Sequence, residues 1–297
     1  MSKVVLITGT SSGLGLSLAT LLGENGYKVY ASMRNLSKKE KLENSTANFR
    51  KNVFIVPLDV QDQSSIDSCV EKILDKEGRI DILINNAGAG FVKTTEQATE
   101  EEINWVFNVN ALGTIRCIKS VLPSMRKHKE GRIINVSSVG GLVGQPFNEF
   151  YCAAKFAVEG YTESLSTYVG PAFNIKFSLV EPGGIMSDFV QNVQSKMGEN
   201  LTVDNKEYQA LLDQYFESTR YLTPQQASYL MQTPNQVAQV VLEVIENPNP
   251  PLRVRTSQWA NEFCELKTQA DPDGEKLKTR LIQGMENKNM YMTPGMN

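Results

Sequence analysis

Near its start the chain reads Val4-Val5-Leu6-Ile7-Thr8-Gly9-Thr10-Ser11-Ser12-Gly13-Leu14-Gly15. The first five residues are apolar or β-branched, which is typical of a strand covered on both faces. The glycines permit a tight turn and let a phosphate approach the main chain without a Cβ in the way. Apolar residues then recur at helical spacing over Leu14–Gly23, and a helix presents free N–H groups and a positive dipole at its amino end. The segment therefore predicts a strand, a phosphate-binding turn and a helix.

The same alternation of strand and helix continues outward from this segment. Further strands are predicted at Lys28–Ser32, Val53–Pro57, Ile82–Asn85, Arg132–Ser137 and Ile175–Val180. Helical spacing marks Ser64–Lys76, Glu100–Arg126, Cys152–Val169 and Pro234–Glu246. Strands that alternate with helices favour right-handed crossovers and one parallel sheet with helices on both faces. We therefore predict an α/β fold with a doubly wound parallel sheet, in a single domain over residues 1–286.

The pattern changes after Pro182. Residues 184–234 are rich in Gln, Ser, Asn, Tyr and Met, and strand signals end there. We interpret about 185–233 as a partly helical substrate lid inserted into the domain. A C-terminal extension with two helical patterns follows, and we expect residues 287–297 to form a loose tail.

The composition excludes several classes of protein. The chain has 297 residues, 41% of them hydrophobic, and a formal net charge of −3, which is typical of a globular protein and argues against nucleic-acid binding. The four cysteines are scattered and the single histidine, His128, lies in a polar run, so we expect no metal site and no Ser-His-Asp triad. The first apolar run is too short for a signal peptide or a membrane span, and we expect a cytoplasmic protein.

A set of ordered motifs resembles the short-chain dehydrogenase/reductase family. The motifs are Thr8–Gly15, Asn85-Asn86-Ala87-Gly88, Asn110, Ser138, Tyr151-x-x-x-Lys155 and Pro182-Gly183, over roughly residues 3–190. The resemblance implies a Rossmann-type fold. It also implies an oxidoreductase that moves a hydride between a nicotinamide cofactor and a carbonyl or alcohol substrate.

Tyr151 and Lys155 are the predicted proton-transfer pair. They are four residues apart, so a helix places both side chains on one face. Tyrosine has an ordinary pKa near 10 and is a poor base at neutral pH, but a nearby ammonium group favours the phenolate and lowers that pKa. We therefore expect a lowered pKa for Tyr151 and general acid/base catalysis by its hydroxyl.

The resemblance assigns two more catalytic residues. Ser138 would donate a hydrogen bond to the substrate oxygen, and the backbone of Asn110 would hold a water linked to the lysine. Ser137 and Asn108 are close neighbours in sequence. We choose Ser138 from its spacing to Tyr151, and Asn110 from the pattern of the residues after it.

The end of the second strand predicts which cofactor binds. An acidic residue there suits the ribose of NAD, whereas a basic residue suits the 2′-phosphate of NADP. Residues 29–35 contain no Asp or Glu, and Arg34 falls at the strand end, where a guanidinium can hold a phosphate with paired hydrogen bonds. We therefore predict NADP(H). The residues expected at the cofactor are Gly9, Ser11, Ser12, Gly13, Leu14, Gly15, Arg34, Asp59, Val60, Asn86, Ala87, Gly88, Tyr151, Lys155, Pro182, Gly183, Ile185 and Ser187.

By the same resemblance, Asp59 and Val60 would contact the adenine ring. The backbone of Ile185 would contact the nicotinamide carboxamide, and the Ser187 hydroxyl would reach a phosphate oxygen.

The substrate is expected beside Ser138 and a set of apolar side chains. That set is Leu142, Val143, Phe147, Met186 and Phe189. An apolar lining suits a hydrophobic ketone, aldehyde or secondary alcohol. Residues 16–19, 31–34 and 250–253, with the long lid and extension, resemble the subgroup containing 17β-hydroxysteroid and retinol dehydrogenases.

Three alternatives stay open. The chain could be an NAD-dependent alcohol dehydrogenase or an acyl-chain ketoreductase of the same family, or a non-catalytic NADP-sensing protein. Because the long helices Glu100–Arg126 and Cys152–Val169 are the usual subunit contacts of the family, we also expect a homodimer or homotetramer.

Overall fold

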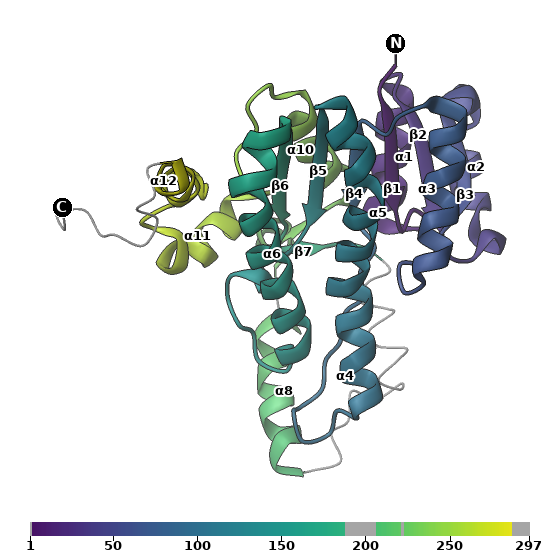
Figure 1. The fold of residues 1–297 in the computed structure, drawn as a ribbon. Coiled ribbons are helices and arrows are strands. Elements are labelled where there is room, and N and C mark those ends of the chain that lie inside the picture. Colours follow the sequence, from purple (N-terminus) through teal and green to yellow (C-terminus); the bar gives the residue numbers. More distant parts are fainter. Residues whose placement is uncertain (1, 188–205, 221–222, 287–297) are drawn as a thin grey trace.

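The computed structural model describes residues 2–187, 206–220 and 223–286. Its centre is a seven-stranded sheet in the order β3-β2-β1-β4-β5-β6-β9 (Figure 1). The strands are β1 Val4–Thr8, β2 Lys28–Met33, β3 Val53–Pro57, β4 Ile82–Asn85, β5 Gly131–Val136, β6 Ile175–Glu181 and β9 Arg253–Arg255. Every pairing in the sheet is parallel. The predicted doubly wound α/β sheet is confirmed, and its strand order reverses between β1 and β4, where such sheets bind ligands.

Helices cover both faces of the sheet. They are α1 Gly13–Glu24, α2 Glu40–Ser45, α3 Gln63–Glu77, α4 Glu100–Phe107, α5 Gly113–His128, α6 Glu149–Phe173 and α10 Pro234–Glu246. Leu6 and Ile7 point to opposite faces because side chains alternate along a strand. Leu6 joins a core with Val106 and residues of α3, α5 and α6, whereas Ile7 joins a core with residues of α1 and α10. The two apolar layers fix the sheet between the two sets of helices.

The predicted helix over Glu100–Arg126 is not uniform. The structure has α4, then a π-helical segment at Asn108–Leu112, and then α5. Pro123 lies within α5. Short 3₁₀ segments occur elsewhere, at Leu36–Lys38, Ala47–Asn52 and Val139–Gly141.

The expectation that residues 184–234 contain no strand is wrong, and one strand further along the chain was not predicted. A two-stranded parallel pair forms from β7, Gly184–Ile185, and β8, Met231–Gln232, and β9 adds a strand to the main sheet beside β6. The sequence Arg253-Val254-Arg255 is short and charged, so it carries little of the apolar signal by which strands are recognised. The arginines of β9 are accommodated because carboxylates of α6 and β6 pair with them.

The segments after β6 lie at two sides of the sheet. The segment predicted to form a lid contains α8, Lys206–Arg220, and α9, Pro224–Leu230. Figure 1 shows α4 and α8 extending together beyond one end of the sheet, and the Tyr208 hydroxyl donates a hydrogen bond to the Glu96 carboxylate at 2.7 Å. The C-terminal α11, Gln258–Thr268, and α12, Glu275–Glu286, lie on the side away from β1–β3. The predicted tail lies outside the described residues.

Within the ranges given above, no helix combines the length and the apolar character needed to cross a membrane.

Candidate active site

The turn after β1 is built from glycines that no other residue could replace without a shift. Gly9 and Gly13 have φ values of +73° and +55°, in the left-handed region. A Cβ on Gly9 would lie 2.9 Å from the Ala87 Cα, and a Cβ on Gly15 would lie 2.1 Å from the Gly9 carbonyl oxygen. The predicted phosphate loop is therefore a close-packed turn in which a side chain at position 9 or 15 would collide with neighbouring backbone atoms.

The end of β4 holds this turn in place. The Thr8 hydroxyl accepts hydrogen bonds from the backbone N–H groups of Asn86 and Ala87, both at 3.0 Å. The Asn86 side chain donates to the Thr8 and Gly9 carbonyl oxygens at 2.9 and 3.0 Å. The motif at residues 85–88 therefore acts directly on the glycine turn.

The amino end of α1 faces the segment that follows β6. Ser12 occupies the N-cap position with extended backbone, and its side chain makes no capping hydrogen bond. A Cβ on Gly13 would lie 3.2 Å from the Ser187 Cβ, so Ser187 lies beside the turn. The Pro182 carbonyl oxygen accepts from the Val139 N–H at 2.9 Å, and Ile185 pairs with Gln232 in the β7–β8 pair.

The end of β5 meets three successive turns of α6. The Lys155 Nζ donates a hydrogen bond to the Val136 carbonyl oxygen at 2.9 Å. Ser138 hydrogen-bonds Tyr151, and the Ser138 hydroxyl accepts from the Gly140 N–H at 3.0 Å. Ser137, by contrast, lies beside Glu159 one turn further along the helix. The geometry thus brings Ser138, Tyr151 and Lys155 together and directs Ser137 elsewhere.

The expected lowering of the Tyr151 pKa by the lysine is wrong for this structure. Burial raises the pKa of Tyr151 to about 12, although the hydrogen bond from Ser138 acts in the opposite direction. Burial also lowers the pKa of Lys155 to about 8, and the carboxylate of Glu159 opposes that change. The Lys155 Nζ is 5.8 Å from the centre of the Tyr151 ring and donates to a backbone carbonyl instead. Near pH 7 the pair is therefore a neutral phenol beside an ammonium group.

Asn110 lies in the π-helical segment between α4 and α5. Its side chain is fully buried, donates to the Ala89 and Val106 carbonyl oxygens at 2.9 and 3.0 Å, and accepts from the Ala89 N–H at 2.9 Å. A Cβ on Gly88 would lie 3.0 Å from the Asn110 Oδ1 and 3.7 Å from the Lys155 Nζ. Asn110, Gly88 and Lys155 are therefore neighbours, and the wider π-helical turn places the backbone of Asn110 at a point where such turns often serve function.

Arg34 and Asp59 lie at the carboxyl ends of β2 and β3. Arg34 is exposed directly after Met33, the last residue of β2. The Asp59 carboxylate accepts from the Gln61 N–H at 3.0 Å, and the Val60 carbonyl oxygen accepts from the Arg116 guanidinium at 3.2 Å. Because neighbouring parallel strands end at the same edge, these residues lie on the side of the sheet where the glycine turn lies.

The predicted substrate residues are only partly brought together. Leu142 and Val143 pack with Val139 against α11, whereas the Phe147 side chain is buried at a backbone φ of +62°. Met186 is half exposed in the segment after β7. Phe189 lies outside the described residues.

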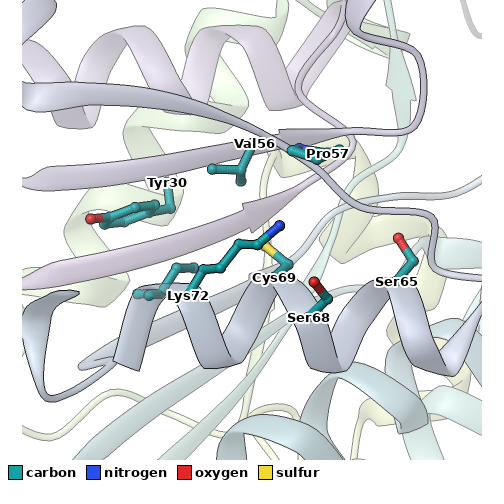
Figure 2. A pocket seen from close by; sticks show the side chains of 8 residues that line it. Tyr30, Val56, Pro57, Ser65, Ser68, Cys69 and Lys72 are labelled. Carbon is teal, nitrogen blue, oxygen red and sulfur yellow. The ribbon is translucent and has the colours of Figure 1, made fainter. Parts of the chain in front are cut away.

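A cavity of about 110 Å³ lies away from these residues, between β2, β3 and α3 (Figure 2). Its lining consists of Tyr30, Val56, Pro57, Ser65, Ser68, Cys69, Lys72 and Ile73. None of the predicted catalytic, cofactor or substrate residues is among them, but the Ser65 hydroxyl accepts a hydrogen bond from the Asp59 N–H at 3.0 Å, so the cavity borders the expected adenine end of the site.

Four charged residues near the site were missed from sequence. Glu159 and Glu181 are buried at the back of the α6 and β6 contact, and Arg253 and Arg255 reach them from β9. The helical spacing Tyr151, Lys155, Glu159 is the signal that could have found the first of them. The strand that carries the arginines gave no such signal.

Comparisons with known proteins identify the family. The family model described as short chain dehydrogenase matches residues 3–198. The chain is 38% identical over 253 residues to 3-ketodihydrosphingosine reductase of Bacteroides thetaiotaomicron, which covers 85% of this chain and 87% of that protein. It is 38% identical over 278 residues to retinol dehydrogenase 8 of Bos taurus, with 92% and 86% covered. It is 34% identical over 284 residues to 17-beta-hydroxysteroid dehydrogenase type 1 of Homo sapiens, with 94% and 84% covered.

Solved structures share the fold over nearly the whole chain. A short-chain dehydrogenase from Streptomyces avermitilis superposes with a TM-score of 0.75 at 26% identity, covering 99% of this chain and all (100%) of that one. ElxO, solved with NADP bound, superposes with a TM-score of 0.72 at 26% identity, covering 88% of this chain and 100% of its own.

The glycine turn, the Ser-Tyr-Lys cluster and these comparisons define an oxidoreductase on a nucleotide-binding sheet. The chain belongs to the short-chain dehydrogenase family. The predicted likeness to retinol and 17β-hydroxysteroid dehydrogenases is confirmed.

Proposed function

We propose that the chain is an NADP(H)-dependent oxidoreductase that interconverts a hydrophobic ketone or aldehyde with the corresponding alcohol. The observation that carries the proposal is the contact of Ser138 with Tyr151, with Lys155 one helical turn away. Among the family members reported above, ElxO was solved with NADP and the curated relatives are named for retinol, a steroid and a ketosphingoid base.

The residues present fit a dinucleotide. The glycine turn is a cradle in which a Cβ on Gly9 or Gly15 would collide, so a phosphate can approach its N–H groups and the amino end of α1. Ser11, Ser12 and Ser187 offer hydroxyls at this end of the sheet, and Arg34 offers an exposed guanidinium to a 2′-phosphate. Asp59 and Val60 would hold the adenine end, and the residues from Asn86 to Gly88 and from Pro182 to Ser187 would line the rest.

In the proposed mechanism the protein handles the proton. A bound nicotinamide would supply or accept the hydride. The Ser138 hydroxyl donates a hydrogen bond to the substrate oxygen, and the neutral Tyr151 phenol gives its proton to that oxygen in the direction of reduction. The raised pKa of Tyr151, about 12, keeps the proton in place until the oxygen becomes basic. The Lys155 ammonium then stabilises the phenolate that remains, and the Asn110 backbone would hold the water that returns a proton.

The experiment is an initial-rate screen with NADPH and with NADH. Retinal, 17-ketosteroids, 3-ketodihydrosphingosine, aromatic ketones and acyl thioesters are the substrates, and Tyr151→Phe is compared with Tyr168→Phe on the same helix. We expect NADPH-dependent reduction of at least one hydrophobic carbonyl, a loss of about 100-fold or more in Tyr151→Phe, and little change in the control. Tight NADPH binding without turnover of any carbonyl would overturn the proposal and favour the sensing alternative.

The same proposal includes the lid, the assembly and the location. Residues of about 185–233 would cover the substrate, which the contact between Tyr208 and Glu96 supports because it joins α8 to the segment before α4.

We propose a cytoplasmic homodimer or homotetramer, and light scattering that finds a monomer would contradict the assembly.

A further inference from the structure

A cluster of buried charges lies behind the candidate active site. The Arg253 Nε lies 3.1 Å from a Glu159 carboxylate oxygen and 3.6 Å from a Glu181 carboxylate oxygen. Arg253 also pairs with Glu163 at 2.7 Å, and Arg255 pairs with Glu181 at 3.1 Å. The Glu181 side chain is 0% exposed and the Glu159 side chain 5%. Two carboxyl groups from α6 and β6 therefore meet at one guanidinium nitrogen in the interior.

Each of these two carboxyl groups has one buried oxygen that lacks a hydrogen-bond donor among the described residues. Among the described residues, the Glu159 Oε1 and the Glu181 Oε1 are buried and have no hydrogen-bond partner within bonding geometry, and the Ser137 hydroxyl, a hydrogen-bond donor, lies beside Glu159. The two groups are nevertheless within hydrogen-bonding reach of each other. Since two ionised carboxylates can only accept, such a contact leaves both oxygens unsatisfied and two like charges adjacent in a medium of low polarity. A single proton between them would supply the missing donor and remove the repulsion.

The charged groups around Glu159 and Glu181 do not fully offset the negative charge of the two carboxylates, and this favours a bound proton. The charged and titratable groups that face the pair are Lys155 and Glu163 on α6, Arg253 and Arg255 on β9, and Cys264 on α11. Burial and the neighbouring Glu159 raise the pKa of Glu181 to about 8, although Arg255 and Arg253 oppose this change. Burial also raises the pKa of Glu159, although the Ser137 hydroxyl and Arg253 oppose it. Two guanidinium groups therefore do not fully offset three carboxylates at this depth.

Glu159 also connects the cluster to the active site. It follows Lys155 by one helical turn, and its charge stabilises the Lys155 ammonium against the cost of burial. We propose that Glu159 and Glu181 share one proton, and that Glu159 in this pair is a positioning residue that keeps Lys155 charged. The first half concerns the folded chain alone, and the second half rests on the proposed function.

The first test measures unfolding against pH. A folded carboxyl with a raised pKa holds a proton that the unfolded chain has released, so stability falls as pH rises from about 4.5 toward the folded value of about 8. Urea unfolding of the wild type and of Glu181→Gln is compared between about pH 5.5 and 7.5. Release of one proton on unfolding raises the unfolding equilibrium constant about tenfold per pH unit. We therefore expect this constant to rise with pH more steeply in the wild type than in the variant, by a factor of up to about ten per pH unit.

Glu163→Gln is the matched control, because it removes a carboxylate on the same helix that pairs with the same arginine through Nη2, whereas Glu159 and Glu181 lie at its Nε. It should keep the pH slope of the wild type. Equal slopes in the wild type and in Glu181→Gln would overturn the shared proton.

A second measurement does not depend on how well a variant folds. Infrared spectra of the wild type at pH 7 should contain a protonated carboxyl band that disappears above about pH 9 and is retained in Glu163→Gln. Its absence from the wild type at pH 7 would also overturn the shared proton.

The activity readout tests the positioning role. Glu159→Gln should move the alkaline limb of kcat/KM to lower pH and leave the rate at the acidic end close to that of the wild type, whereas Glu163→Gln should not move the limb. An unmoved limb in Glu159→Gln would overturn the positioning role. If no carbonyl is reduced at all, the proposed function fails, but the unfolding and infrared experiments still decide the shared proton.

Discussion

The Lys155 ammonium nitrogen is held 2.9 Å from the Val136 carbonyl oxygen, at the point where β5 ends and the loop with Ser138 begins. The side chain is buried, and burial lowers its pKa to about 8. This hydrogen bond therefore fixes the position of α6 against β5, and the ammonium group that donates it loses its charge only slightly above neutral pH.

The pH dependence of reduction should reveal this lysine. As pH rises through about 8, Lys155 loses its proton and can no longer stabilise the phenolate of Tyr151, so kcat/KM should fall by about tenfold per pH unit. Initial rates from pH 6 to pH 10 check this. Lys155→Arg, which stays charged, should lose the alkaline limb even if its rate is lower, whereas Lys119→Arg on the exposed side of α5 should retain it. A flat profile in the wild type would contradict the assignment.

Arg34 should set the preference for NADPH. Arg34→Ala removes a guanidinium expected to hold the 2′-phosphate, and charge-assisted hydrogen bonds contribute about 1.5–3 kcal/mol. The KM for NADPH should therefore rise by roughly 10- to 100-fold, and the KM for NADH should change little. Lys38→Ala, another exposed basic residue four positions later, is the control and should leave both values unchanged. A wild type that prefers NADH, with no effect of Arg34→Ala, would exclude this role.

The glycine turn should not tolerate a methyl group at Gly15. A Cβ there would lie 2.1 Å from the Gly9 carbonyl oxygen and 2.6 Å from the Asn86 amide nitrogen. We expect Gly15→Ala to lower the free energy of unfolding by about 1–3 kcal/mol and to weaken NADPH binding at least tenfold. Thermal unfolding and fluorescence titration with NADPH are the measurements.

Gly160→Ala provides the comparison for that substitution. Gly160 lies within α6, and a Cβ there would meet nothing within 4 Å. Alanine is favoured over glycine inside a helix by about 1 kcal/mol, so this variant should be equal to the wild type or more stable. Equal effects of the two alanines would show that the turn has no special need for glycine at position 15.

Six of the seven strands of the central sheet were predictable from sequence because they are largely apolar, whereas the short, charged β9 was missed. The bounds of β1, β3, β4 and α10 agree with the prediction at both ends. The other predicted elements differ mainly at their ends, where backbone capping and not apolar spacing decides the boundary. The π-helical turn at Asn110 could not be predicted because its residues carry the same apolar spacing as the helices on both sides.

The site was predictable in its members but not in its electrostatics. Spacing and resemblance placed Ser138, Tyr151 and Lys155 together, because four residues make one helical turn. The pKa of Tyr151 was predicted in the wrong direction because the sequence shows how close a lysine is along the helix but not how deeply both groups are buried. The proximity of Glu159 to Glu181 was missed because the two residues lie on different elements, α6 and β6, and sequence spacing does not show contacts between elements.

The strand β9 has one more consequence, because it limits edge-to-edge pairing of the sheet with other molecules. Without β9, the apolar strand β6 would end the sheet with a row of unpaired N–H and C=O groups, which is a template for pairing with a strand of another molecule. The strand that covers it is only three residues long, and two of the three are arginines. Short, charged edge strands resist further strand addition. We therefore expect β9 to protect the folded chain against aggregation at this edge, and a truncation near residue 250 should be far less soluble than the full chain.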